Sequence, residues 1–181
     1  MTAPTTASLA ERPLDTEYAP YYGRYVSRVP EGDVLRTLET GLAETLSLLR
    51  GVPESRAGHR YGEGKWSLKE VVGHMTDTER IFAYRALRIG RGDATPLPGF
   101  EQDDYVRNAG FDRVPLADLV AEFEAVRRAT ILLFRAMDDR ALARRGTASG
   151  VEVTVRALAF IIAGHERHHQ RILRERYLNS R

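Results

Sequence analysis

The chain has 181 residues, enough for one domain with a single hydrophobic core and no covalent staples. It contains no cysteine, which excludes disulfides, iron–sulfur clusters, cysteine nucleophiles and thiolate metal ligands. Its 27 basic and 25 acidic residues are spread along the sequence with a net charge of +2, a balance that argues against a nucleic-acid partner.

Residues 1–30 are expected to form an N-terminal arm outside the main domain. They contain four prolines and four tyrosines and have no sustained helical period. We expect about the first dozen residues to be disordered and the rest to pack as an extended strap on a single domain, residues 31–181, because tyrosine is amphipathic. The start MTAPTTASLAERP does not resemble a secretory signal, and no stretch approaches about 20 apolar residues. We therefore expect a cytoplasmic protein without a membrane partner.

Two amphipathic helices are predicted in the first half of the domain. Between Asp33 and Gly51, apolar side chains recur at spacings of three and four residues. The second helix begins at SLKE (67–70), where a serine hydroxyl and a glutamate carboxylate can form a capping box. Its apolar face continues to Gly90.

The second half of the domain begins with a long connection at residues 91–114, which has no periodic apolar face. It is long enough to run back along a helix, since extended chain covers roughly 3.3 Å per residue and a helix about 1.5 Å. Pro115 opens a third helix, and after a turn a fourth runs from about Thr154 to near Tyr177. With no convincing strand, the sequence predicts an all-α four-helix bundle whose second and third helices run parallel.

Three of the five histidines lie in GHERHHQ (164–170). Counting 100° per residue places His165 and His169 in the middle of the inward apolar face of the fourth helix. Imidazoles four residues apart can bind one divalent metal, because successive turns bring their Cβ atoms within about 5–6 Å. His74 lies about 120° from the centre of the second helix's apolar face and can supply a third nitrogen. Three neutral ligands would leave the metal an open position, as in reactive sites.

The same residue types allow other interpretations. An inward histidine on a helix is often a core residue that bonds to a tyrosine or a carboxylate. His168 lies near the border of the apolar face and is interpreted as a flanking residue, and His59 falls in a connection where it is expected to be solvated. Glu79 lies near the centre of an apolar face. It could orient a ligand imidazole, form a salt bridge with a buried arginine or carry protons.

Four segments carry a resemblance to a known family: APYYGRYVSRVP (19–30), GKWSLKEVVGHMTDTERIFAYRALRIGRGD (64–93), PGFEQDDYV (98–106) and ALAFIIAGHERHHQRILRERYL (157–178). In these segments the chain resembles the DinB-like branch of the DinB/YfiT-like superfamily of metal-dependent proteins. The resemblance implies a four-helix bundle in up-down-down-up order, often assembled as a homodimer. It also implies a metal site formed by His74, His165 and His169.

The resemblance further implies chemistry, since members of the superfamily include bacillithiol transferases and a mycothiol-dependent isomerase. We therefore expect a metal-dependent transferase that activates a small thiol toward an electrophile, with zinc or nickel as the metal. In residues 98–106, Phe100, Gln102, Asp104 and Tyr105 either line the open metal position or form a well-packed loop. Two alternatives stay open: a hydrolase that uses metal-bound water, and a stress-related dimeric binding protein without catalytic activity.

Overall fold

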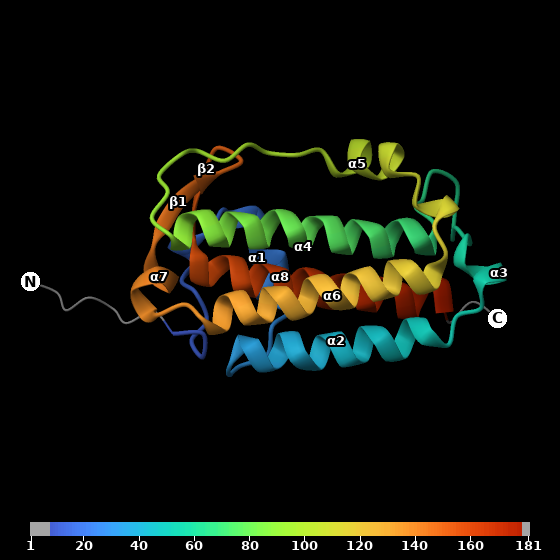
Figure 1. Ribbon diagram of the computed structural model, residues 1–181, viewed down its shortest axis with the longest axis horizontal. Coiled ribbons are helices and arrows are strands. Elements are labelled where there is room, and N and C mark those ends of the chain that lie inside the picture. The colour runs from blue at the N-terminus through green and yellow to red at the C-terminus, as the bar shows by residue number, and fades with distance from the viewer. Residues whose placement is uncertain (1–7, 179–181) are drawn as a thin grey trace, which may run out of the picture.

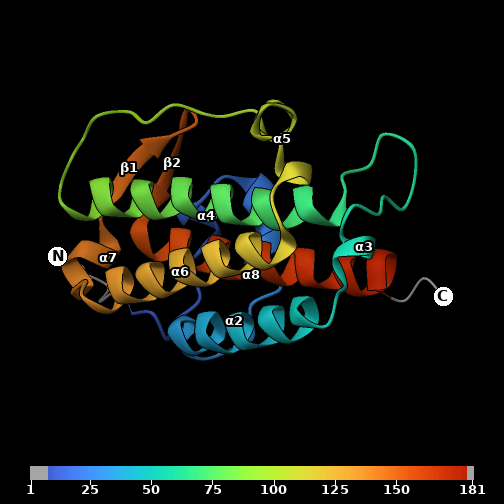
Figure 2. The ribbon, with the colours of Figure 1, turned by 45° about the vertical axis from the view of Figure 1, so that its right-hand side comes forward.

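Four long helices form the body of the protein, whose computed structural model describes residues 8–178. They are α2 (Val34–Arg50), α4 (Leu68–Gly90), α6 (Leu116–Arg135) and α8 (Val155–Ile172). Helices α2 and α8 run in one direction and α4 and α6 in the other (Figures 1 and 2). This arrangement confirms the predicted up-down-down-up bundle with parallel second and third helices. Among the described residues, no helix combines the length and apolar character needed to cross a bilayer.

Side chains cap the starts of three long helices, as the local sequence requires. The predicted capping box is present: Ser67 Oγ accepts the N–H of Glu70 at 3.1 Å, and the Glu70 carboxylate accepts the N–H of Ser67 at 2.8 Å. The Asp33 and Thr154 side chains accept backbone N–H groups at the starts of α2 and α8. Each such cap stabilises its helix by about 1 kcal/mol.

The crossover between α4 and α6 passes over the outer side of α4 (Figure 1). It contains two short elements that the sequence analysis did not predict, α5 (Gln102–Ala109) and the 3₁₀ turn η3 (Phe111–Arg113). Within α5 only Val106 is buried, so there was no apolar stripe from which to predict a helix. Gly110, with φ of 68°, ends α5 in the left-handed conformation that glycine adopts without strain.

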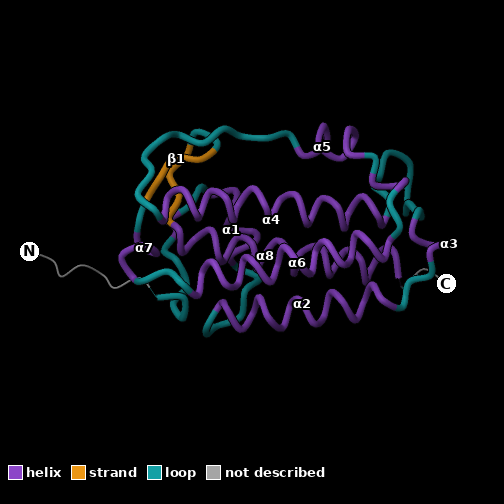
Figure 3. The backbone as a smooth tube through the Cα atoms, in the orientation of Figure 1, coloured by secondary structure: helices purple, strands orange, loops and turns teal. Residues whose placement is uncertain are grey.

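A small β-hairpin follows the short helix α7 (Asp139–Ala143) and precedes α8 (Figure 3). Strands β1 (Arg145–Ala148) and β2 (Val151–Thr154) are antiparallel, and the crossover joins them through the N–H of Leu97 to the carbonyl of Thr147. The expectation of a simple turn here was wrong. Ser149 and Gly150 have φ of 54° and 76°, which is typical of the type I′ turn that closes two-residue hairpins.

The N-terminal strap, defined here as residues 13–29, lies along the bundle against α8. Its elements are η1 (Asp15–Glu17), η2 (Pro20–Tyr22) and α1 (Gly23–Val26). The strap is therefore a series of short helical turns and not the extended chain that we expected. The expected disorder of the first dozen residues falls partly on residues 1–7, outside the described residues. Leu9 and Arg12 already form hydrogen bonds, with the N–H of Val34 and the carbonyl of Val29.

The hydrophobic core is divided into two halves by polar side chains at mid-height of the bundle. One half includes Leu38, Phe82, Phe134 and Ile162, and the other includes Leu42, Met75, Phe123 and Leu173. The buried polar residues of this layer include Thr45, Glu79, Arg127, His165, Glu166, His169 and Gln170. The π-helical segment η4 (Leu173–Leu178) extends α8 beyond this level, close to the predicted end at Tyr177.

Candidate metal centre

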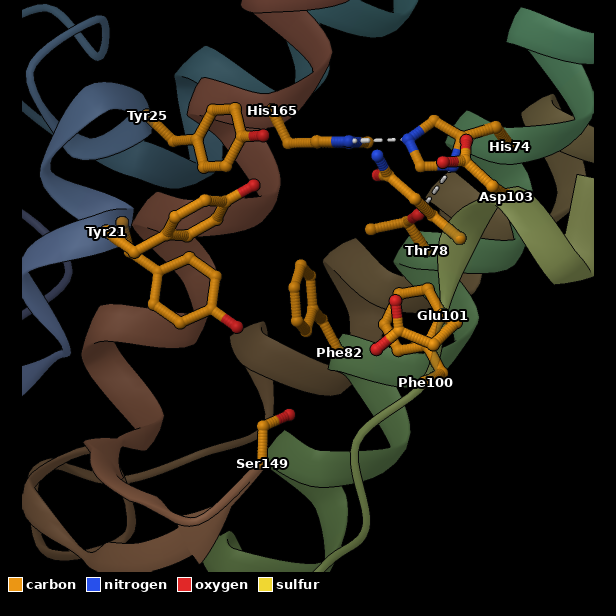
Figure 4. Close-up of a pocket in the computed structure, with 12 residues that line it drawn as sticks. Tyr21, Tyr25, His74, Thr78, Phe82, Phe100, Glu101, Asp103, Ser149 and His165 are labelled. Atoms are coloured by element: carbon orange, nitrogen blue, oxygen red, sulfur yellow. Dashed lines mark hydrogen bonds between the residues drawn. The ribbon is translucent and has the colours of Figure 1, made fainter.

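The structure brings His74 of α4 together with His165 and His169 of α8. The Nε2 atom of His165 lies 3.1 Å from Nε2 of His74 and 3.1 Å from Nε2 of His169. One ligand atom from each ring lies within 4.8 Å of the other two. The residues are only 4, 6 and 7% exposed, respectively. Figure 4 shows His74 and His165 facing each other across the gap between their helices.

These three rings carry the donor set of a divalent metal. Burial lowers the pKa of His74 to about 4 and those of His165 and His169 well below the ordinary value, so all three are neutral at pH 7. A neutral Nε2 has one lone pair or one proton, so the Nε2 of His165 can hydrogen-bond to only one of its two neighbours. A cation between the rings would accept all three lone pairs. Ligand nitrogens around a tetrahedral zinc lie about 3.3 Å apart, close to the observed spacing.

Neighbouring side chains hold the outer faces of the rings. Thr78 Oγ1 lies 3.4 Å from Nδ1 of His74, and the Tyr25 ring packs edge-on against His165 with 5.3 Å between centroids. Nδ1 of His169 is buried and has no hydrogen-bond partner among the described residues. His168 stays outside the cluster and contacts Tyr25 and His169 as a flanking residue.

A buried ionic network, made of Arg127, Glu79 and Glu166, lies next to the three histidines. Arg127 has no exposed surface and donates to both oxygens of Glu79, at 2.8 and 2.7 Å, and to Glu166 and the carbonyl of Leu38. It therefore links α6 to α4, α8 and α2. Burial alone would lower the pKa of Arg127, but the two carboxylates raise it above its ordinary value.

Glu79 forms the buried salt bridge that was one of the roles open for it, because both of its carboxylate oxygens accept hydrogen bonds from Arg127. Sequence reasoning missed Glu166, which also accepts the hydroxyl of Thr45 at 2.7 Å. Burial raises the pKa of Glu166, against the opposing effect of Arg127.

A cavity of about 290 Å³ opens from His74 and His165 to the surface (Figure 4). Its walls come from the tyrosines of the strap, from Thr78 and Phe82 of α4, from residues 100–103 of the crossover and from Ser149 of the hairpin turn. His169 does not line it. His74 and His165 thus line a pocket that a small molecule can enter, and His169 contacts them without reaching it.

Residues 98–106 contribute to this cavity in part. Phe100 and Gln102 line it, together with Glu101 and Asp103. Asp104 and Tyr105 are exposed and do not line it. The strap tyrosines were noticed in the sequence, but their position over the site depends on how α1 packs on α8.

The fold and the site together define a class of helical-bundle proteins in which three histidines from two helices meet beside an open cavity. The chain belongs to the DinB superfamily, whose family profile matches residues 37–173. A candidate metal-dependent hydrolase of Oceanobacillus iheyensis is 23% identical over 137 residues, which cover 75% of this chain and 76% of that protein.

Two solved structures share this fold. YfiT from Bacillus subtilis, described as a probable metal-dependent hydrolase with an unusual four-helix bundle topology, superposes with a TM-score of 0.72. It is 14% identical, and the match covers 91% of this chain and 90% of YfiT. A mycothiol-dependent maleylpyruvate isomerase gives a TM-score of 0.65 at 16% identity, over 76% of this chain and 57% of the isomerase. At these identities the likeness establishes the fold alone.

Proposed function

We propose that the protein is a metal-dependent hydrolase whose divalent metal is held by His74, His165 and His169. The observation that carries the proposal is the meeting of three buried, neutral imidazoles, two of which line an open cavity. When bound, such a metal polarises a substrate group and lowers the pKa of a water molecule. The names of the two metal-dependent hydrolases to which the chain is similar also support this choice.

The protein's own residues would orient the ligands and restrict water around the site. The Arg127 network fixes α4 and α8 at the level of the histidines, which keeps the rings in place before a metal binds. Thr78 contacts Nδ1 of His74 and favours the orientation in which Nε2 faces the other rings. Tyr25 and Phe82 cover the inner cavity with aromatic surface, which lowers the local dielectric and strengthens polar interactions with a substrate.

A thiol transferase is the second candidate, and the absence of cysteine supports it because no protein thiol competes for the metal. The likeness to a mycothiol-dependent isomerase points the same way. Among the described residues that line the cavity, however, none is a lysine or an arginine, so a thiol that carries carboxylates would find no cationic partner there. For this reason we place hydrolysis first.

Element analysis of untagged protein, combined with activity assays, tests these proposals. We expect about one zinc or nickel per chain in the wild type and in His59→Ala, which removes an exposed histidine outside the site. His165→Ala should lose the metal and keep its helical circular dichroism. Wild type without bound metal would favour the non-catalytic alternative.

Ester, amide and phosphoester substrates should then be screened with and without a small thiol. Hydrolysis that is lost in His165→Ala and unchanged by thiol supports the first proposal. Turnover that requires the thiol would replace it with the transferase.

A further inference from the structure

We infer that the cavity binds an organic cation, a ligand with an ammonium-type group attached to an apolar or aromatic body. This inference deepens the proposed function. It rests on that function in one respect, namely that the other end of the ligand would face the histidines. Three features of the cavity carry it: aromatic walls, two carboxylates without ion-pair partners, and the absence of lysine and arginine from the described lining.

Aromatic rings surround the accessible space. Tyr21 and Tyr22 pack edge to face with centroids 5.3 Å apart, and Tyr22 packs in the same way on Phe82 at 6.0 Å. Tyr25 and Phe100 complete the set of five rings that line the cavity. Ring faces carry partial negative charge and attract cations, most strongly where water is excluded. Figure 4 shows Tyr21 and Tyr25 on the strap side of the cavity, and Phe82 and Phe100 on the side of α4 and the crossover.

Two carboxylates, Glu101 and Asp103, lie on the crossover side of the cavity (Figure 4). Neither forms a hydrogen bond or salt bridge through its side chain with any residue between 8 and 178. The next acid, Asp104, does not line the cavity and pairs with Arg107 at 2.7 Å. The unpaired negative charges of this segment are therefore those that face the cavity.

Two arginines contact these rings without lining the cavity themselves. Arg85 is 2% exposed and donates to the carbonyl of Pro98 at 2.8 Å and to Ser149 Oγ at 2.9 Å. Its guanidinium lies 5.3 Å from the centroid of the Phe82 ring and 5.9 Å from that of the Phe100 ring. The exposed Arg24 stacks on the Tyr21 ring at 4.0 Å from its centroid. Neither arginine pairs with Glu101 or Asp103, so the two carboxylates remain available to a ligand.

Three aromatic probes of similar size separate charge from shape: benzyltrimethylammonium, benzyl alcohol and benzoate. The quaternary ammonium group cannot coordinate a metal or donate a hydrogen bond, so its binding reports the rings and the carboxylates alone. Dissociation constants should be measured by NMR titration for metal-loaded and for metal-free wild-type protein. We expect the cation to bind at least tenfold more tightly than the alcohol in both forms, and benzoate to bind the metal-free form most weakly.

The double variant E101Q/D103N should weaken binding of the cation by about 25-fold, with about fivefold from each carboxylate. D104N is the matched control on the same helical turn and should leave the affinity within twofold. Raising the salt concentration should weaken cation binding in the wild type and in D104N, and much less in the double variant. This salt test on the wild type keeps the inference testable even if the double variant fails to fold.

Equal affinity of the wild type for the cation and the alcohol would overturn the inference, as would unchanged cation binding in the folded double variant. The proposed hydrolase function is tested by different results. If the protein binds the cation but holds no metal and hydrolyses no substrate, the inference stands and the hydrolase proposal is wrong. Metal-dependent hydrolysis without any preference for the cation would do the reverse.

Discussion

Replacing Arg127 by methionine should strongly lower the free energy of unfolding of the bundle. The substitution deletes four hydrogen bonds and leaves Glu79 and Glu166, which are 3 and 2% exposed, without their cation. Removing one partner of a buried ion pair costs about 3–5 kcal/mol. The carbonyl of Leu38 lies within α2 and keeps its helical hydrogen bond, so it adds little. We therefore expect a loss of about 3–5 kcal/mol, a large part of the stability of a typical domain.

Urea unfolding of metal-free protein, followed by circular dichroism, measures this loss. Arg128→Met is the matched control, because Arg128 is the next residue on α6, is exposed and pairs with Glu124. It should cost less than about 1 kcal/mol, as surface pairs do. The triple variant E79L/R127M/E166L removes all three charges together and should recover most of the loss, because no carboxylate is then buried alone.

Two results would refute this reasoning. If Arg127→Met were as stable as Arg128→Met, the network would contribute nothing beyond a surface pair. If the triple variant were as unstable as the single one, the loss would come from packing and not from uncompensated charge.

Two further predictions concern the strap. Gly164→Ala should lower the midpoint of thermal unfolding sharply, whereas Gly58→Ala should not, because an added Cβ at Gly164 would overlap the Tyr25 carbonyl and at Gly58 it meets open space. Burial alone would raise the pKa of Glu17, but hydrogen bonds from Arg156 and other groups outweigh it and lower that pKa. The stability that Glu17 provides is thus present above the ordinary carboxyl pKa of about 4.5 and is lost as the pH falls through the folded-state value. The difference in unfolding free energy between wild type and Glu17→Gln should shrink over that range, and a constant difference would contradict the assignment.

The long helices could be predicted from the sequence because their signals are local. The recurrence of apolar residues along α2 and the SLKE start of α4 each act within a few residues of chain. The same locality placed His165 and His169 on one inward face, since their geometry depends only on the turn of a single helix. The position of His74 beside them is a different matter, because it depends on how two helices far apart in the sequence pack. Helical periodicity alone could only make His74 a candidate third ligand.

The features that the sequence did not reveal depend on contacts between distant segments. The hairpin forms where the crossover adds a backbone hydrogen bond from Leu97, and α5 is held by little more than Val106. Glu166 occupies a border position on its helix by angular counting, yet it is buried because Arg127 of α6 and Thr45 of α2 reach it. An amphipathic pattern records which side of a helix is apolar, and it contains no information about which partner neutralises a polar residue.

The position of the polar layer explains why glycines occur where the helices meet. A Cβ at Gly41 of α2 would overlap the carboxylate of Glu166, and one at Gly164 of α8 would overlap the strap backbone. Glycine lets α2 approach the ionic network and lets α1 approach α8 beside His165, so that charged and imidazole groups are covered by backbone instead of water. Burial lowers the pKa values of His165 and His169 well below the ordinary value, so the rings that these glycines help to cover resist protonation while their Nε2 atoms stay 3.1 Å apart.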